Sequence, residues 1–358
     1  MGGLTRTERA VLAVVVVATA LAGAARYGGF APLLAFVLAG VALAGLAHVV
    51  SLGTEQVGER LGPAATGLMQ STLGNLPELF VVIFALKKGE TVVALTSILG
   101  SLFSNALLVL GLVIVVGARA SGDGVMRFRR RLPADTATLL LVTSFIIVVV
   151  GQSLSSHDPA SHHVRSISVI AAIALLAVYV AWVIPYVRGD ELPEREPASE
   201  GQAKGPRVPL SVSVGLLAFG GVGAAFVSDW FIAALRPSID QLGISSAFAG
   251  LVIVAIAGNA VENVAGIVLA HKGRADLAVS VVKNSVAQVS AFLYPVLVLI
   301  SLLFAHQLTF ALAPVYTGAL LLTALIVWQI TGDGEALAFE GWALVAIYVI
   351  LAAITLYE

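Results

Sequence analysis

Two glutamates in this 358-residue chain lie within apolar segments, and each ends the same short motif. The first copy, Gly-Asn-Leu-Pro-Glu, spans Gly74–Glu78, and the second, Gly-Asn-Ala-Val-Glu, spans Gly258–Glu262. A constant offset of 184 residues relates the copies and also superposes Ser101 on Ser285, with eight identities across positions 74–105. The chain therefore carries an internal duplication with one polar motif in each copy.

The two carboxylates, Glu78 and Glu262, indicate a cation site. An ionised glutamate near the centre of a bilayer costs several kcal/mol unless it is paired, protonated or bound to a cation. Two facing carboxylates match the charge of a divalent cation, and their hard oxygens favour Ca²⁺. Two crowded acids also bind protons more tightly than one isolated acid. The residues thus predict a site that Ca²⁺ or protons can fill, which is the basis of an antiporter.

The residues before each glutamate add neutral oxygens and a helix break. Asn75 and Asn259 lie three residues before Glu78 and Glu262, so each pair shares a helix face. Gly74 and Gly258 permit a break in the helix, and broken backbone is tolerated at membrane depth only where it lines a cavity. We therefore expect both motifs to line the cation site.

The next apolar segment of each copy carries a second polar row. Ser101 and Asn105 are four residues apart, and Ser285 and Gln288 are three apart, so each pair occupies one helix face. Their oxygens could complete a Ca²⁺ shell of about six or more ligands. They could equally form hydrogen bonds between helices, and the sequence leaves both interpretations open.

The composition is that of a helical membrane protein. Apolar residues make up 59% of the chain and charged residues 11%, against about 25% charged residues in soluble domains. The sequence contains many runs of the roughly 20 apolar residues that span a bilayer. The chain has no cysteine, which excludes disulfides and thiolate metal sites, and a net charge of −1 gives no sign of nucleic-acid binding.

We predict eleven membrane-spanning helices. They lie near residues 10–26, 31–52, 64–86, 91–117, 134–152, 166–187, 208–235, 246–271, 275–303, 307–330 and 337–356. These helices divide into an N-terminal helix (1–30), a five-helix repeat (31–187), a polar cytoplasmic linker (188–207) and a second five-helix repeat (208–358).

The distribution of Lys and Arg orients the chain. With a cytoplasmic amino terminus, fourteen basic residues fall in inner loops and five in outer loops, as the positive-inside rule requires. A run of basic residues at 127–131 is the densest part of this bias and suits anionic headgroups. Because each repeat has an odd number of helices, the second must insert upside-down, as in secondary transporters. The two motifs would then meet at mid-depth.

The motifs resemble the signatures of the cation/proton exchangers, the Ca²⁺/H⁺ antiporters of the calcium/cation antiporter superfamily. The resemblance rests on residues 74–89, on Gly100-Ser101-Leu102-Phe103-Ser104-Asn105, and on Gly258–Glu262 with Ser285 and Gln288. It implies a multi-pass protein, expected in a bacterial plasma membrane, that exports Ca²⁺ in exchange for H⁺. It also implies that Glu78 and Glu262 are the central carboxylates. No cofactor is expected.

Three departures from the family pattern stand out. Asn263 stands where the family usually has His, Lys283-Asn284 precede Ser285 where the family usually has Gly, and Val261 replaces the proline of the first copy. On a continuous helix Lys283 lies roughly 160° from Ser285 and so points away from it. If Lys283 instead reaches the pathway, exchange of Na⁺ or another monovalent cation for H⁺ becomes the alternative.

Two other classes of protein compete with the transporter. A channel would share the carboxylates without coupling cation flux to protons. A membrane enzyme would need a nucleophile–base set or a compact His/Asp metal motif in its spans, and the sequence contains neither. We therefore predict a transporter and not an enzyme.

Overall fold

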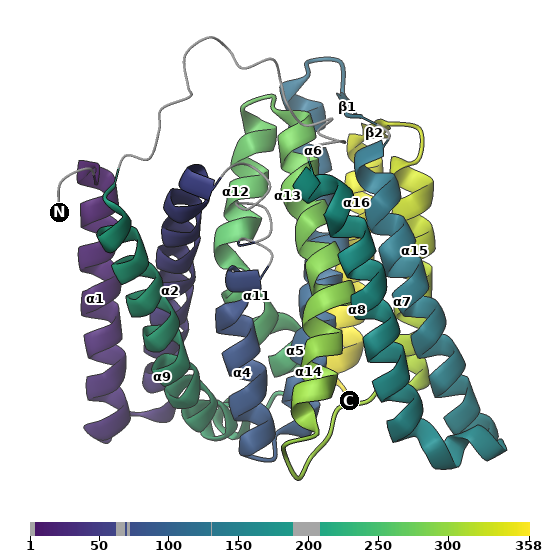
Figure 1. Ribbon diagram of the computed structural model, residues 1–358, viewed down its shortest axis with the longest axis horizontal. Helices are drawn as coiled ribbons and strands as arrows, with labels where there is room; N and C mark the ends of the chain where they lie inside the picture. The colour runs from purple at the N-terminus through teal and green to yellow at the C-terminus, as the bar shows by residue number, and fades with distance from the viewer. Residues whose placement is uncertain (1–3, 62–68, 70–71, 130, 189–207) are drawn as a thin grey trace. The chain divides into compact units, whose positions relative to one another are not determined.

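The computed structural model describes residues 4–61, 69, 72–129, 131–188 and 208–358, and this part of the chain is almost entirely helical (Figure 1). Nine described helices are long and apolar enough to cross a membrane, and a bent pair, Ser246–Gly258 with Ala260–His271, is a tenth candidate. Of the region predicted as a helix near 64–86, the structure describes mainly the 12-residue helix from Leu76 to Lys87. Residues 189–207 of the predicted linker lie outside the described residues.

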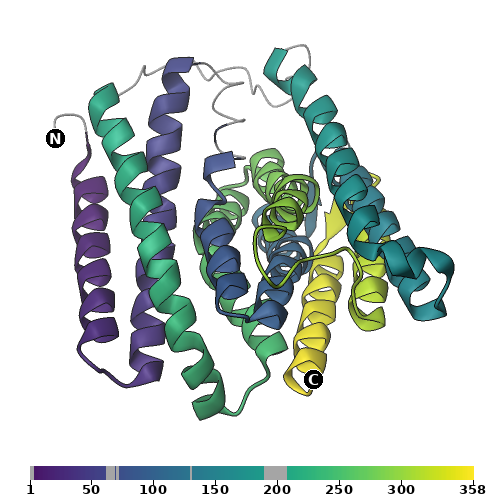
Figure 2. The ribbon, with the colours of Figure 1, turned by 60° about the horizontal axis from the view of Figure 1, so that its bottom comes forward.

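One compact unit comprises Met1–Lys88 and Val180–Ser246. Its helices are α1 (Arg6–Tyr27), α2 (Pro32–Leu61), α4 (Leu76–Lys87) and α9 (Leu210–Leu242). The long helices α1, α2 and α9 lie side by side (Figures 1 and 2). Phe36 stacks on Phe231 with ring centroids 4.6 Å apart, which packs α2 against α9.

The other unit comprises Gly89–Tyr179 and Ala247–Glu358. Its first helices are α5 (Thr91–Phe103), α6 (Leu110–Ala120), α7 (Arg131–Ser156) and α8 (Val164–Arg188), whose last turns belong to the first unit. A short 3₁₀ helix, η2 (Pro159–His163), precedes α8. The later helices are α10 (Ser246–Phe248), α11 (Ala255–Gly258), α12 (Ala260–His271), α13 (Ala275–Gln288), α14 (Tyr294–Ser301), α15 (Pro314–Thr331) and α16 (Ala338–Leu356).

Three π-helical turns interrupt the helices of this second unit. They are η1 (Ser104–Val109) between α5 and α6, η3 (Ala249–Val254) before α11, and η4 (Val289–Leu293) between α13 and α14. Such turns are rare and occur frequently at functional sites. The turn η1 contains Asn105 of the first predicted polar row, and η4 begins directly after Gln288, the last residue of the second.

Glycines bring the helices of this unit into close contact. A Cβ on Gly100 of α5 would lie 2.6 Å from Leu251 Cα and 2.7 Å from Ala255 Cβ. Gly111 of α6 and Gly341 of α16 cross so closely that a Cβ on either would lie 2.6 Å from the carbonyl oxygen of the other. Small residues allow this approach between membrane helices, where dispersion contacts and hydrogen bonds replace the hydrophobic effect.

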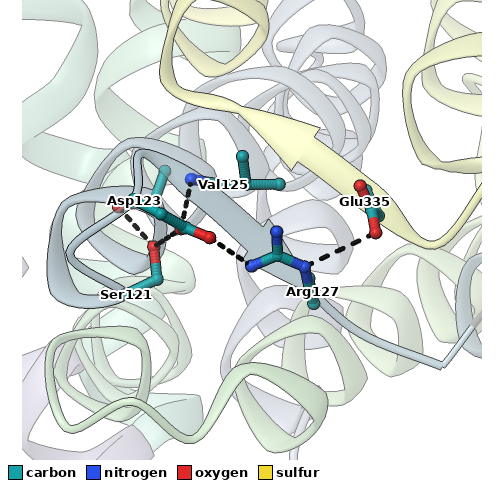
Figure 3. Close-up of polar contacts among 6 residues, drawn as sticks. Ser121, Asp123, Val125, Arg127 and Glu335 are labelled. Carbon is teal, nitrogen blue, oxygen red and sulfur yellow. Dashed lines mark hydrogen bonds and ion pairs between the residues drawn. The ribbon is translucent and has the colours of Figure 1, made fainter.

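A two-stranded ribbon joins two loops of the second unit. Strand β1 (Val125–Arg127) pairs antiparallel with β2 (Glu335–Leu337). Arg127 bonds Asp123 at 2.6 Å and lies 3.5 Å from Glu335 (Figure 3). The Arg127 guanidinium, with hydrogen bonds from Val125 N–H and the Ser121 hydroxyl, lowers the pKa of Asp123 to about 2. Both loops were predicted on one side of the membrane, and their pairing agrees with that arrangement.

Candidate ion-binding site

The internal duplication is present in the backbone. Helices α4 and α12 each have 12 residues, and both begin directly after the motif asparagine. Asn75 has φ −88° and ψ 9°, and Asn259 has φ −97° and ψ 9°. The glycines that follow the two helices, Gly89 and Gly273, both adopt left-handed conformations with φ of 80° and 71°. The two sequence copies therefore fold into the same local structure.

Both motifs coincide with a break in a span. The chain bends by 63° between α11 and α12, at Asn259. In the first copy Gly74 and Asn75 form a turn, and α4 begins after it with Pro77 in its first turn. Proline is accommodated there because the first N–H groups of a helix have no intrahelical partner. The predicted helix breaks are thus confirmed.

Asn259 connects the second motif to the polar row of the first repeat, within one unit. Its amide nitrogen donates to Ser101 Oγ at 2.9 Å and to the carbonyl of Ala255 at 3.0 Å. Its amide oxygen accepts from Asn105 Nδ2 at 3.2 Å. The three side chains of Asn259, Ser101 and Asn105 are at most 3% exposed. These hydrogen bonds hold the three polar side chains together in the interior of the unit.

Glu262 lies in the first turn of α12, one turn beyond Asn259. The Ser285 hydroxyl of α13 lies beside its carboxylate, but not in hydrogen-bond geometry. Among the described residues, Glu262 Oε2, Ser285 Oγ and the amide oxygen of the neighbouring Asn263 are buried without a hydrogen-bond partner. Buried oxygens without partners are costly, and a cation or a proton would satisfy them.

The first motif lies in the other unit. Asn75 is 3% exposed and Glu78 is 8% exposed. Glu78 occupies the first turn of α4, the position that corresponds to Glu262 in α12, and Gly74 lies in the turn before the helix. Because Glu78 and Glu262 belong to different units, their approach to one another stays a prediction.

Helix α13 carries both the second polar row and Lys283. Ser285 and Gln288 are both buried. Lys283 is 6% exposed and lies on a stripe with Asp276 and Ser290, which are seven residues away on either side. Asp276 accepts from Arg129 N at 2.9 Å, and the Ser290 carbonyl accepts from Thr143 Oγ1 at 3.4 Å. Arg129 lies just before α7 and Thr143 lies within it, so Asp276 and the Ser290 carbonyl are on the side of α13 near α7. That Lys283 points away from Ser285 stays a prediction.

The structure thus brings together Ser101, Asn105 and Asn259, and separately Glu262 and Ser285. Sequence reasoning did not identify two further buried hydroxyls, those of Ser104 and Tyr348, which lie beside each other. The position of Ser104 next to Asn105 was the available signal. For Tyr348 the sequence offered none, because its place against η1 depends on the packing of α16.

The sodium/calcium exchanger protein family model matches residues 31–185 and 212–357. The chain belongs to this family. The membership confirms the predicted resemblance and identifies the chain as an integral multi-pass membrane protein.

Relatives of this exchanger cover most of its length. The Ca²⁺/H⁺ antiporter of Synechocystis is 29% identical, over 97% of this chain and 97% of the relative. The Ca²⁺/H⁺ antiporter ChaA of Bacillus subtilis is 30% identical, over 87% of this chain and 89% of the relative. The vacuolar calcium ion transporter of Schizosaccharomyces pombe is 30% identical, over 90% of this chain and 79% of the relative.

Solved exchanger structures confirm the fold. Native YfkE superposes with a TM-score of 0.79 at 26% identity, over 97% of this chain and 100% of the other. The H⁺/Ca²⁺ exchanger CAX superposes with a TM-score of 0.74 at 19% identity, over 99% of this chain and 93% of the other, and supports the fold alone. The predicted class, an all-α membrane protein with an N-terminal helix and two inverted five-helix repeats, is therefore confirmed.

Proposed function

We propose that this exchanger moves Ca²⁺ across a membrane in exchange for H⁺. The observation that carries the proposal is the duplicated helix start, in which a glutamate with a buried carboxylate oxygen follows an asparagine by one turn at a break in a span. Relatives named Ca²⁺/H⁺ antiporter match 87% and 97% of the chain. The family and the residues therefore point to the same cation.

In the proposed mechanism, Glu78 and Glu262 bind Ca²⁺ when both are ionised and release it when both are protonated. Either occupant leaves the site near neutral, whereas two bare carboxylates at membrane depth would cost several kcal/mol each. Neutral oxygens complete the Ca²⁺ shell, and the candidates are the side chains of Asn75, Asn259, Ser101, Asn105, Ser285 and Gln288. The break at Gly74 and Gly258 gives the ion access to them.

Exchange requires that the loaded site opens to one side of the membrane at a time. Because an empty site with two ionised glutamates is unfavourable, the protein changes its opening mainly when Ca²⁺ or protons are bound. That preference couples the two fluxes, whereas a channel would need no such coupling. We further propose a bacterial plasma membrane location with the amino terminus in the cytoplasm, on the basis of the basic residues in the predicted inner loops.

Exchange of Na⁺ for H⁺ is the second candidate. Asn263 occupies the position next to Glu262 where the family usually has a titratable His, and its amide oxygen is buried without a partner among the described residues. A neutral oxygen there could serve a monovalent cation as well as Ca²⁺. The alternative shares the site and the fold and differs only in the ion carried.

The deciding experiment is uptake of Ca²⁺ and of Na⁺ into proteoliposomes under an imposed pH gradient. We expect Ca²⁺ uptake that stops when the gradient is collapsed by a protonophore, with Na⁺ failing to compete at equal concentration. Na⁺ uptake driven by the gradient, with no Ca²⁺ uptake, would favour the second candidate. Cation flux that ignores the gradient would contradict exchange altogether.

A further inference from the structure

Two buried hydroxyls lie just outside the candidate ion-binding site, in the second unit. Ser104, the first residue of η1, is fully buried, and Tyr348 of α16 is 4% exposed. Their side chains are neighbours, yet neither Ser104 Oγ nor the Tyr348 hydroxyl has a hydrogen-bond partner among the described residues. An unpaired buried hydroxyl costs about 1–3 kcal/mol, and lipid offers no compensating water.

The packing of α16 places Tyr348 opposite Ser104. Helices α6 and α16 cross at Gly111 and Gly341, where their backbones nearly touch. Ser104 lies seven residues before Gly111, and Tyr348 lies seven residues after Gly341, so an antiparallel pair brings both to the same side of the crossing, where α16 packs against η1. The close glycine contact favours this register, because a side chain at either position would clash with the other backbone.

Ser104 is connected to the ion-binding side chains through one carbonyl group. Its backbone N–H donates to the carbonyls of Gly100 and Ser101. The Ser101 carbonyl also accepts from Asn105 Nδ2 at 2.9 Å, and the same nitrogen donates to Asn259 Oδ1 at 3.2 Å. A shift of Ser104 therefore changes how Asn105 meets Asn259.

We propose that Tyr348 is a positioning residue of the exchanger: its hydroxyl bonds the Ser104 hydroxyl when the cation is bound and so fixes the π-helical turn that presents Asn105 to Asn259. A Phe facing an Ala would fill the same space without two unpaired hydroxyls, so packing alone does not account for these residue types. The inference rests on the proposed Ca²⁺ site. It assigns the hydroxyl pair to the affinity of that site and not to the stability of the fold.

The test uses Tyr348→Phe and Ser104→Ala, each of which removes a single oxygen, and the double variant. Ca²⁺ binding to the purified full-length protein is measured by the Ca²⁺-dependent rise in melting temperature, and uptake is measured in proteoliposomes. Each single variant should raise the half-saturating Ca²⁺ concentration about three- to tenfold, the effect of one hydrogen bond, with little change in maximal rate. The double variant should have a half-saturating Ca²⁺ concentration no higher than that of the more affected single variant.

Tyr294→Phe is the matched control. Tyr294 is fully buried in the same unit, and its hydroxyl donates to the Thr309 carbonyl at 2.8 Å. Its loss should lower the melting temperature without changing half-saturation. Unchanged half-saturation in Tyr348→Phe, or additive effects in the double variant, would overturn the inference while Ca²⁺ uptake by the wild type upheld the proposed function. A wild-type protein that binds no Ca²⁺ would overturn both.

Discussion

Glu78 and Glu262 each lie in the first turn of a helix that starts at a break within the span. The N-terminus of a helix carries a partial positive charge, which stabilises a nearby carboxylate. The same break interrupts the regular hydrogen-bond pattern, and side chains such as Asn259 bind the backbone there instead. An acid at this position can thus stay ionised long enough to bind a cation, yet remains costly when the site is empty.

Replacing either acid by its neutral isostere should abolish exchange. Glu78→Gln and Glu262→Gln keep the shape of the side chain and remove the charge that balances Ca²⁺, so we expect folded proteins with no Ca²⁺ uptake under a pH gradient. Glu340→Gln is the control, because Glu340 also lies in a first helical turn but accepts from Leu337 N at the start of α16. Normal uptake in either site variant would refute the assignment.

Lys283 should affect stability and not ion preference. It lies seven residues from Asp276, which bonds Arg129 just before α7, and from Ser290, whose carbonyl accepts from Thr143 of α7. We expect Lys283→Met to lower the melting temperature, because removal of a buried charge leaves the polar groups around it uncompensated. The ratio of Ca²⁺ to Na⁺ uptake should stay unchanged. Lys272→Met, at an exposed lysine, should change neither. A shifted uptake ratio in Lys283→Met would place the ammonium group in the cation pathway.

At the scale of elements, the breaks could be predicted from sequence because they depend on local signals. Glycine frees the backbone at positions 74 and 258, and proline restricts it at position 77. The duplication repeats the glycine signal in the second copy. The hydrogen bond between Asn105 and Asn259 joins residues 154 positions apart and depends on how α5 packs against α11. Both residues were predicted as ligand candidates from the sequence, but their mutual contact depends on the fold.

The close crossing of α5 and η3 should not tolerate a side chain at Gly100. A Cβ there would overlap the backbone of Leu251, and overpacking of this kind typically costs about 1–3 kcal/mol. We expect Gly100→Ala to lower the melting temperature and to weaken Ca²⁺ uptake, because Ser101 follows directly and would be displaced.

Gly318→Ala provides the comparison for Gly100→Ala. Gly318 lies in α15 of the same unit, and nothing lies within 4 Å of the Cβ that alanine would add. Alanine has the higher helix propensity by about 1 kcal/mol, so this variant should be as stable as the wild type or more so. Equal melting temperatures for the two alanine variants would show that the crossing can relax.

At the scale of the whole molecule, the positions of the apolar spans could be predicted because apolar length acts along the chain, and nine described helices with one bent pair are candidates for the eleven predicted spans. The ribbon between β1 and β2 could not, since its strands have three residues each and no alternating pattern that stands out. It nevertheless agrees with the predicted topology, because it pairs two loops that an alternation of the predicted spans places on the same side of the membrane. The paired loops carry Arg127 and, through Arg129 and Asp276, also contact the start of α13.

The charge bias predicts which side of the membrane these loops occupy, and the absence of cysteine from the chain makes the prediction easy to test. Ala120, at the end of α6, and His162, before α8, are exposed and belong to the same unit. In intact cells a membrane-impermeant maleimide should label His162→Cys from outside and leave Ala120→Cys unlabelled until the membrane is opened. Both variants should retain Ca²⁺ uptake, since neither residue lies at the site. The reverse labelling would invert the topology, and with it the direction in which the proton gradient drives Ca²⁺. Labelling of both from outside would contradict the alternation itself, because α7 would then not cross the membrane.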